Sequence, residues 1–182
     1  MTSCDTFTMP YGCDVRILAV CGSLQAKSKN LALLNTAATS APPGVRLVLF
    51  DGLRDLPHFN PDMESSGVPE SVRRWRQALA DSDAVLVACP EYGFSLPGAL
   101  KNGIDWVIGS GELEQKVMAI TAAVPAADRG RRGLQALRDT LSAVRATLVG
   151  GEPIPLGPDF EFQIAALVRT LVKAAVAARI RR

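Results

Sequence analysis

PEYGFSLPGALKNGIDW, residues 90–106, is the stretch that decides the fold of this chain. The run before it, residues 84–89, reads AVLVAC and has the apolar composition of a β-strand. Pro97 is suited to begin the following helix, because proline is tolerated in a first helical turn. A loop between such a strand and such a helix lies at the carboxyl end of the strand, where open α/β sheets bind ligands. The stretch therefore predicts a ligand-binding loop.

The rest of the chain repeats this order of strand and helix. Strands are predicted at residues 15–20, 45–50, 84–89, 116–121 and 146–149, and helices at about 30–39, 70–81, 98–108, 132–145 and 160–182. Residues 51–69, 122–130 and 150–159 are predicted to be loops. The alternation and the apolar strands predict one α/β domain over residues 15–182, with a parallel sheet covered on both faces. Residues 1–14 are interpreted as a flexible extension.

The bulk composition limits the function classes. A net charge of +2 over 182 residues gives no reason to expect a nucleic-acid partner. No apolar stretch reaches the roughly 18–20 residues of a membrane span, and residues 1–14 do not resemble a signal peptide. The four cysteines show no metal-ligand spacing, so buried reduced thiols and no metal are expected. We predict a cytoplasmic protein with neither a membrane nor a nucleic-acid partner.

The loop after the first strand has the residue types of a phosphate site. Ser23, Ser28 and Asn30 offer hydroxyl and amide donors, and the N–H groups of a helix start attract an anion. Its sequence matches neither G-x-G-x-x-G nor G-x-x-x-x-G-K-[ST], which disfavours a Rossmann-type dinucleotide fold and a P-loop NTPase. Taken alone, the loop is also compatible with an ordinary strand-to-helix connection in which a serine caps the helix.

Together the two loops resemble those of the NAD(P)H-dependent FMN reductase family, flavodoxin-like proteins that include quinone, azo-dye and chromate reductases. The family's first loop is similar to Gly-Ser-Leu-Arg-x-x-Ser-x-Asn, and residues 22–30 read GSLQAKSKN. In the second loop only Gly93 and Gly103 depart from the family pattern, where asparagine and alanine are usual. The resemblance covers about residues 15–149.

This resemblance implies a doubly wound, flavodoxin-like fold of five parallel strands in the order 2-1-3-4-5. Non-covalent FMN is expected at the switch point between the first and third strands. The implied reaction is hydride transfer from NADPH or NADH through bound FMN to FMN, a quinone or another small electrophile. No catalytic side chain is predicted, because the flavin carries the redox chemistry. A homodimer or dimer of dimers is also implied, and the apolar helix 98–108 is the candidate interface.

The resemblance also implies which residues hold FMN. The predicted contacts are Ser23, Gln25, Ser28, Lys29, Asn30 and Leu31 in the first loop, Pro90, Glu91, Tyr92, Gly93 and Phe94 in the second, and Ala122 and Ala123 in the third. Ser23, Gln25, Ser28 and Asn30 surround the phosphate, whereas residues 90–93 follow the isoalloxazine ring, mainly through their backbone. The carboxylate of Glu91 is interpreted as hydrogen-bonded to nearby backbone rather than as a proton donor.

Departures from the family pattern keep two alternatives open. Gln25 replaces an arginine that would pair with the phosphate, although Lys27 or Lys29 is placed to supply charge. The third loop departs most, and it contains Arg129, Arg131 and Arg132. These arginines either attract a 2′-phosphate, which would favour NADPH, or are simply solvated at the start of a helix. One alternative is a flavodoxin-fold protein without FMN that serves as an interaction or regulatory subunit. The other is an electron carrier, which the net charge of +2 disfavours.

Overall fold

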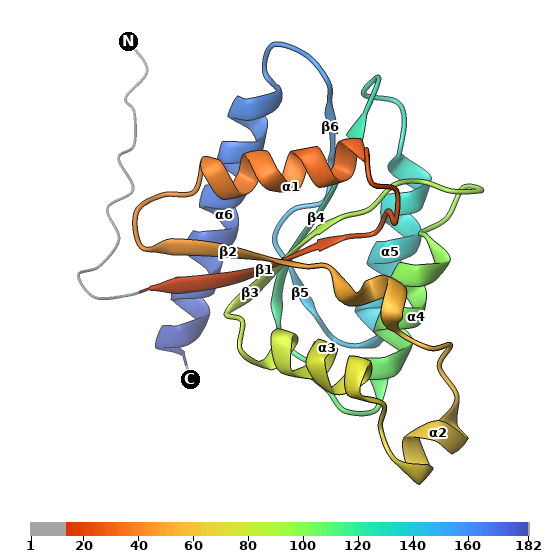
Figure 1. The fold of residues 1–182 in the computed structure, drawn as a ribbon. Helices are drawn as coiled ribbons and strands as arrows, with labels where there is room; N and C mark the ends of the chain where they lie inside the picture. The colour runs from red at the N-terminus through yellow and green to blue at the C-terminus, as the bar shows by residue number, and fades with distance from the viewer. Residues whose placement is uncertain (1–13, 182) are drawn as a thin grey trace.

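The fold is an α/β sandwich around one parallel sheet, seen in a computed structural model that describes residues 14–181 (Figure 1). Most of the predicted extension, residues 1–13, lies outside the described residues. The elements are β1 (Val15–Cys21), α1 (Lys29–Thr39), β2 (Val45–Phe50), the 3₁₀ helix η1 (Gly52–Asp55), α2 (Pro61–Ser66), α3 (Glu70–Ala80), β3 (Ala84–Ala88), α4 (Gly98–Ile108), β4 (Val117–Val124), α5 (Arg131–Ala143), β5 (Thr147–Leu148), β6 (Pro153–Pro155) and α6 (Phe160–Ile180).

The strand order is β2-β1-β3-β4-β5, which confirms the predicted doubly wound topology. β1 lies at the centre of the crossover, where Ile17 pairs with Leu47 of β2 on one side and with Ala84 of β3 on the other. The chain leaves β1 and β3 in opposite directions along the sheet. This reversal separates the loops that follow the two strands and opens a crevice at their carboxyl ends.

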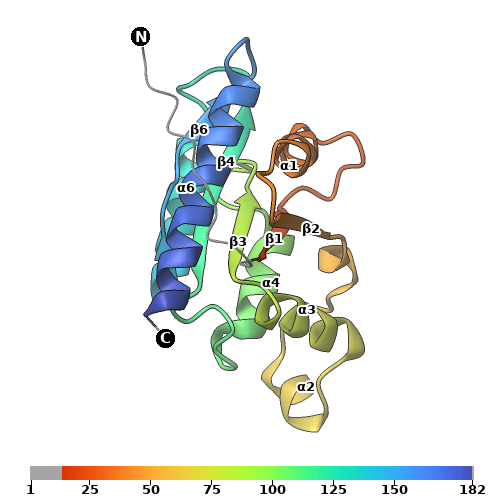
Figure 2. The ribbon, with the colours of Figure 1, turned by 90° about the vertical axis from the view of Figure 1, so that its left-hand side faces the viewer.

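The two faces of the sheet are covered by different helices (Figure 2). α1 and α6 pack on one face, where Leu33, Leu34 and Val168 meet the sheet residues Ile17 and Leu86. The other face carries η1, α3, α4 and α5 over a second set of sheet residues that includes Leu18, Val85 and Ile120. Alternate strand residues point to opposite faces, so each continuous apolar strand supplies both cores.

A sixth strand adds to the predicted five. β4 continues through Val124 instead of ending at Thr121, so Ala122 and Ala123 belong to a strand and not to a loop. The two residues of β5 pair with only the first part of β4, and β6 takes the remaining edge, with Ala122 opposite Pro153 and Val124 opposite Pro155. Proline lacks a backbone N–H and is confined to edge strands, which is why this segment was predicted to be a loop.

The predicted loop over residues 51–69 contains η1 and α2. Asn60 caps α2 by accepting a hydrogen bond from the Asp62 backbone at 2.9 Å, and Pro61 occupies its first turn. α4 has its predicted bounds, but the apolar side chains of Leu100, Ile104 and Val107 are buried in its own subunit. Within residues 14–181, no helix has the combined length and hydropathy of a membrane-spanning segment.

Candidate functional site

Three loops meet at the carboxyl edge of the sheet, after β1, β3 and β4. In the first, the Ser28 hydroxyl caps α1 by accepting from the backbone N–H groups of Asn30 at 3.2 Å and Leu31 at 3.4 Å. The Ser23 hydroxyl lies 3.3 Å from the Tyr92 hydroxyl and accepts from the Gln25 backbone at 3.3 Å. These bonds fix the first loop against the second. They leave the side chains of Gln25, Lys27 and Lys29 exposed beside the start of α1.

Asn30, in the first turn of α1, connects this helix to β4. Its side chain is buried, and its Oδ1 accepts a hydrogen bond from the Ala123 backbone at 2.9 Å. This bond engages the amide oxygen, whereas the phosphate contact predicted for Asn30 would use its Nδ2 donors. Asn30 therefore positions the start of α1 relative to the carboxyl end of β4.

Asn30→Ala is expected to lower the free energy of unfolding by about 1–3 kcal/mol, because the partly buried Ala123 N–H would lose its acceptor. Urea unfolding measures this loss. Asn30→Asp is the matched variant, since it keeps the acceptor but adds a negative charge beside the first loop. It should fold like the wild type but bind FMN more weakly. Wild-type stability in Asn30→Ala would contradict the proposed link between α1 and β4.

The second loop contains a tight turn over residues 92–95. Tyr92 and Ser95 exchange two backbone hydrogen bonds of 3.0 Å, and the central residues Gly93 and Phe94 have φ angles of 57° and 62°. Positive φ at both central positions is typical of a type I′ turn, where glycine and asparagine are favoured. The departure at Gly93 from the family's asparagine is therefore compatible with the same turn. The Phe94 side chain is 68% exposed and does not line the cavity described below.

Glu91 joins the second loop to the first turn of α5. Its Oε2 accepts a hydrogen bond from the Gly133 backbone at 2.9 Å, in the first turn of α5, which confirms the interpretation of a backbone-bound carboxylate. A negative charge at a helix N-terminus is also favourable for the helix dipole. A side chain at position 133 would not fit, because a Cβ atom there would lie 2.9 Å from both Cα and Cβ of Glu91.

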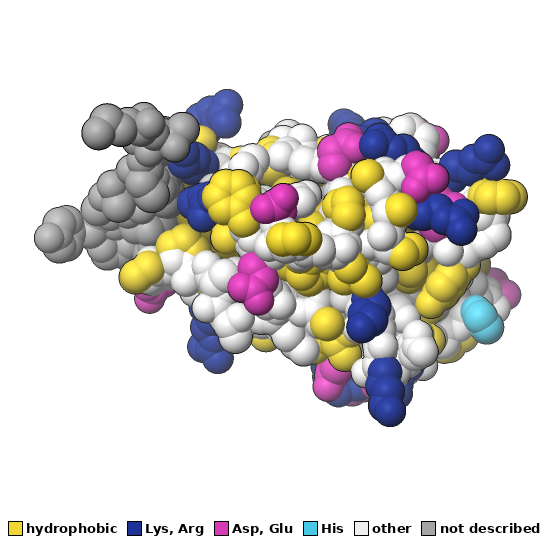
Figure 3. All heavy atoms as spheres, turned by 90° about the horizontal axis from the view of Figure 1, so that it is seen from above, with side chains coloured by type: hydrophobic (Ala, Val, Ile, Leu, Met, Phe, Trp, Pro, Cys, Tyr) yellow, Lys and Arg dark blue, Asp and Glu magenta, His cyan; other side chains and the backbone are white. Residues whose placement is uncertain are grey.

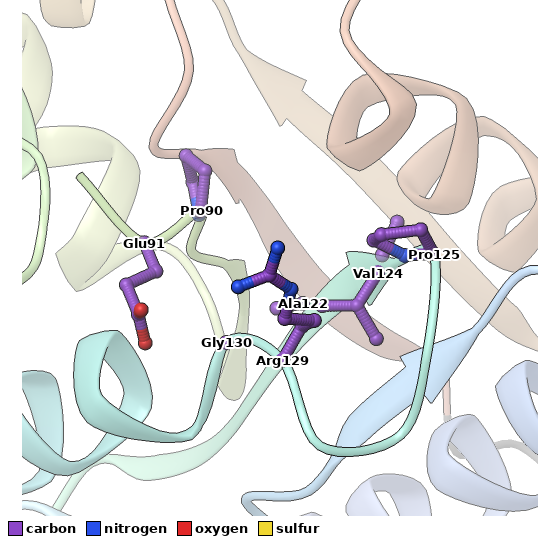
Figure 4. Close-up of a pocket in the computed structure, with 8 residues that line it drawn as sticks. Pro90, Glu91, Ala122, Val124, Pro125, Arg129 and Gly130 are labelled. Carbon is purple, nitrogen blue, oxygen red and sulfur yellow. The ribbon is translucent and has the colours of Figure 1, made fainter. Parts of the chain in front are cut away.

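The second and third loops enclose a cavity of about 260 Å³ (Figure 4). Its lining is mostly small and apolar and consists of Pro90, Glu91, Ala122, Ala123, Val124, Pro125, Arg129 and Gly130. The predicted residues Pro90, Glu91, Ala122 and Ala123 thus share one cavity. A second cavity of about 90 Å³ is lined by residues of the first loop, β2 and η1, and its lining includes the predicted residues Ser23, Gln25 and Leu31.

Comparison with known proteins identifies the family. Residues 15–157 match the sequence profile described as NADPH-dependent FMN reductase. This chain belongs to that family. It is 39% identical over 120 residues to an NAD(P)H-dependent FMN reductase of Pseudomonas aeruginosa, across 66% of this chain and 63% of that protein. The chain thus spans less than two thirds of that relative's length.

Two further comparisons support this family assignment. A quinone reductase of Pseudomonas putida is 35% identical over 130 residues, which cover 69% of this chain and 68% of that protein. The flavoenzyme NAD(P)H:(acceptor) oxidoreductase FerB of Paracoccus denitrificans has a similar structure, with a TM-score of 0.74 and 26% identity over 87% of this chain and 98% of FerB. These matches support the resemblance that the two loops show.

The residues of this FMN reductase family member fit FMN. The start of α1 suits a phosphate, because the positive end of the helix dipole lies there beside the exposed side chains of Lys27 and Lys29. The alanine side chains of Ala122 and Ala123 leave space for a flat ring beside Pro90 and Glu91. The family's loop arginine is missing at Gln25, but Arg54 of η1 reaches the same loop, with Nη2 3.5 Å from the Leu24 carbonyl oxygen. Sequence reasoning missed Arg54, since nothing in its local pattern places it near residue 24.

The cysteines at this edge are buried free thiols, as expected for Cys21 and Cys89; Cys4 and Cys13 lie outside the described residues. Burial, assisted by the negative charge of Glu91, raises the pKa of Cys89 to about 12. Burial also raises the pKa of Cys21. Thiols protonated at neutral pH are poor nucleophiles. Since the raised pKa of Cys89 favours the protonated thiol, its contribution to stability is lost only as the pH rises from about 9 towards about 12.

Among residues 14–181, no group of three or more His, Cys, Asp or Glu side chains is arranged to hold a metal ion.

Proposed function

We propose that this protein is an NAD(P)H-dependent flavin oxidoreductase that transfers electrons through bound FMN to FMN, a quinone or another small electrophile. The observation that carries the proposal is the cavity between residues 90–91 and 122–130, next to the capped start of α1 at the switch point of the sheet. Ligands of open α/β sheets bind at this position. Membership of the FMN reductase family supports the same assignment.

In this proposal the protein holds and orients the cofactor. The first loop and the start of α1 would bind the phosphate, through backbone N–H groups and the exposed side chains of Gln25, Lys27 and Lys29. The ring would lie along the backbone of residues 90–93 and against Ala122 and Ala123. When bound, FMN supplies the chemistry of accepting a hydride and passing on electrons, so the protein needs no general base for that step.

The side chains at the site agree with a positioning role. The Glu91 carboxylate is engaged by the Gly133 backbone and the Ser23 hydroxyl by its neighbours, so both act by holding the loops in place. His58, the one histidine of the chain, is exposed in the segment before α2. Tyr92, with 52% of its surface exposed, borders the second loop where an acceptor or a second subunit would approach.

A small-molecule acceptor, a cytoplasmic location and a homodimer or dimer of dimers are parts of the same proposal. The names of the quinone reductase relatives support the small-molecule acceptor. An electron carrier is the less favoured alternative. Carriers of flavodoxin type present a strongly acidic face, whereas the face in Figure 3 mixes acidic and basic side chains around a band of hydrophobic ones.

The test is oxidation of NADPH and NADH by the protein supplemented with FMN, with and without benzoquinone. The proposal expects turnover that depends on protein and on flavin and rises when the quinone is added. A protein that binds FMN but oxidises neither nucleotide with any acceptor would favour the carrier. A protein that does not bind FMN would favour the interaction or regulatory subunit.

A further inference from the structure

Arg54 is a basic residue of η1 whose side chain lies against the first loop. Its Nη2 donates to the carbonyl oxygen of Leu24, the residue before Gln25, at a long 3.5 Å. Within residues 14–181 its side chain makes no other hydrogen bond and pairs with no carboxylate. The residue is exposed. Most of the N–H donors of its guanidinium are therefore available beside the first loop.

The backbone of η1 is firmly anchored, so the position of Arg54 relative to the first loop is fixed. Leu53 and Leu56, on either side of the segment, are buried in the core that α3 and α4 cover. A Cβ atom at Gly103 of α4 would lie 2.9 Å from Cδ2 of Leu53, which shows how closely η1 and α4 pack. Such a support lowers the entropy that a ligand contact from Arg54 would cost.

Arg54 and Gln25 line the same cavity of about 90 Å³. Gln25 stands where the family's loop has an arginine, and the exposed Lys27 and Lys29 supply point charges without a planar set of donors. A guanidinium has that planar set, which matches a phosphate and forms strong charge-assisted bonds. Asp51 is the acidic residue of this lining, so the three cations outnumber it and leave the loop attractive to an anion.

We propose that Arg54 binds the phosphate of FMN and replaces the arginine that the family has at position 25. This inference rests on the proposed function, which puts that phosphate at the first loop and the start of α1. The guanidinium that pairs with the phosphate then comes from η1, after β2, and not from the loop itself. Arg54 is a binding residue, and its contribution is to the affinity for the cofactor.

The test is equilibrium titration of the flavin-free protein with FMN, followed by flavin fluorescence. Arg54→Gln is expected to raise the Kd for FMN about tenfold, the scale of a lost charge-assisted bond. Adding Gln25→Arg to this variant should restore most of the affinity, because it returns a guanidinium to the loop. Arg46→Gln is the matched control, since it removes the same charge from an exposed residue near the amino end of β2, roughly 13 Å along the strand from Phe50. It should bind FMN like the wild type.

Three binding results would overturn the inference. They are an unchanged Kd in Arg54→Gln, the same loss in Arg46→Gln, and a loss that Gln25→Arg does not repair, which would assign the effect to the bond with Leu24. The urea midpoint of Arg54→Gln should equal that of the wild type, and a lower midpoint would assign Arg54 to the fold instead. Failure of the wild type to bind FMN would refute the proposed function, so the two failures are distinguishable.

Discussion

Gly133→Val is expected to destabilise the fold by about 2–4 kcal/mol and to raise the Kd for FMN about tenfold or more. A Cβ atom at this position would lie 2.9 Å from Cα and Cβ of Glu91 and 3.2 Å from the Ser95 carbonyl oxygen. Two of these three atoms are backbone, so they cannot rotate away. α5 must then move back from the second loop, which breaks the 2.9 Å bond from Gly133 to Glu91 and distorts one wall of the cavity.

Urea unfolding and FMN titration measure the two effects of this substitution. Gly98→Ala is the matched control, because nothing lies within 4 Å of a Cβ atom there and Gly98 is at the start of a helix. It should be neutral or stabilise by up to about 1 kcal/mol. If Gly133→Val bound FMN as tightly as Gly98→Ala, the contact between the second loop and α5 would not shape the site.

Trp106→Ala is expected to lower the free energy of unfolding by about 3–5 kcal/mol. Trp106 has no exposed surface, and its Nε1 donates to the Pro57 carbonyl oxygen at 2.7 Å. Its ring also meets Phe59 edge-on, with 5.1 Å between ring centres. The side chain thus fastens the segment before α2 to the end of α4. Its loss would leave a cavity and remove one of the two hydrogen bonds to the Pro57 carbonyl, the other of which comes from Asn102 Nδ2 at 2.9 Å.

Chemical denaturation, monitored by far-UV circular dichroism, measures this loss in the free energy of unfolding. Trp106→Phe is the companion variant, because it keeps most of the ring volume but loses the hydrogen bond. It should lower the free energy of unfolding clearly less than Trp106→Ala does. Equal losses in the two variants would mean that the bond to Pro57, and not the packing of the ring, dominates.

The strands could be predicted from the sequence because most are nearly continuous apolar runs between turn residues, and their order was implied by the resemblance to the family. The predicted run at 84–89 corresponds to β3, and α4 has its predicted bounds. β6 could not be predicted, because Pro153-Ile154-Pro155 lacks two of the N–H donors of an ordinary strand. β6 forms because β4 extends beyond the two residues of β5, so that the end of β4 has a free edge with which β6 pairs.

The cavity wall could be predicted in part, because Pro90, Glu91, Ala122 and Ala123 all lie at carboxyl ends of neighbouring strands. The hydrogen bonds that hold the elements of the site together could not be predicted. Asn30 and Ala123 are 93 residues apart, and Glu91 and Gly133 are 42 apart. Such contacts depend on how α1 and α5 pack against the sheet. The same holds for Arg129, whose sequence neighbourhood gave no reason to separate it from Arg131 and Arg132.

The visible spectrum of the purified protein, followed by titration with FMN, tests the central claim most directly. The account predicts flavin absorbance bands or, if the flavin is lost during purification, saturable uptake of FMN at a single site. Binding should be weaker in Asn30→Asp than in the wild type, because the added charge lies beside the phosphate loop. A colourless protein that shows no saturable binding would contradict the account and leave a flavodoxin-like fold that has a different ligand.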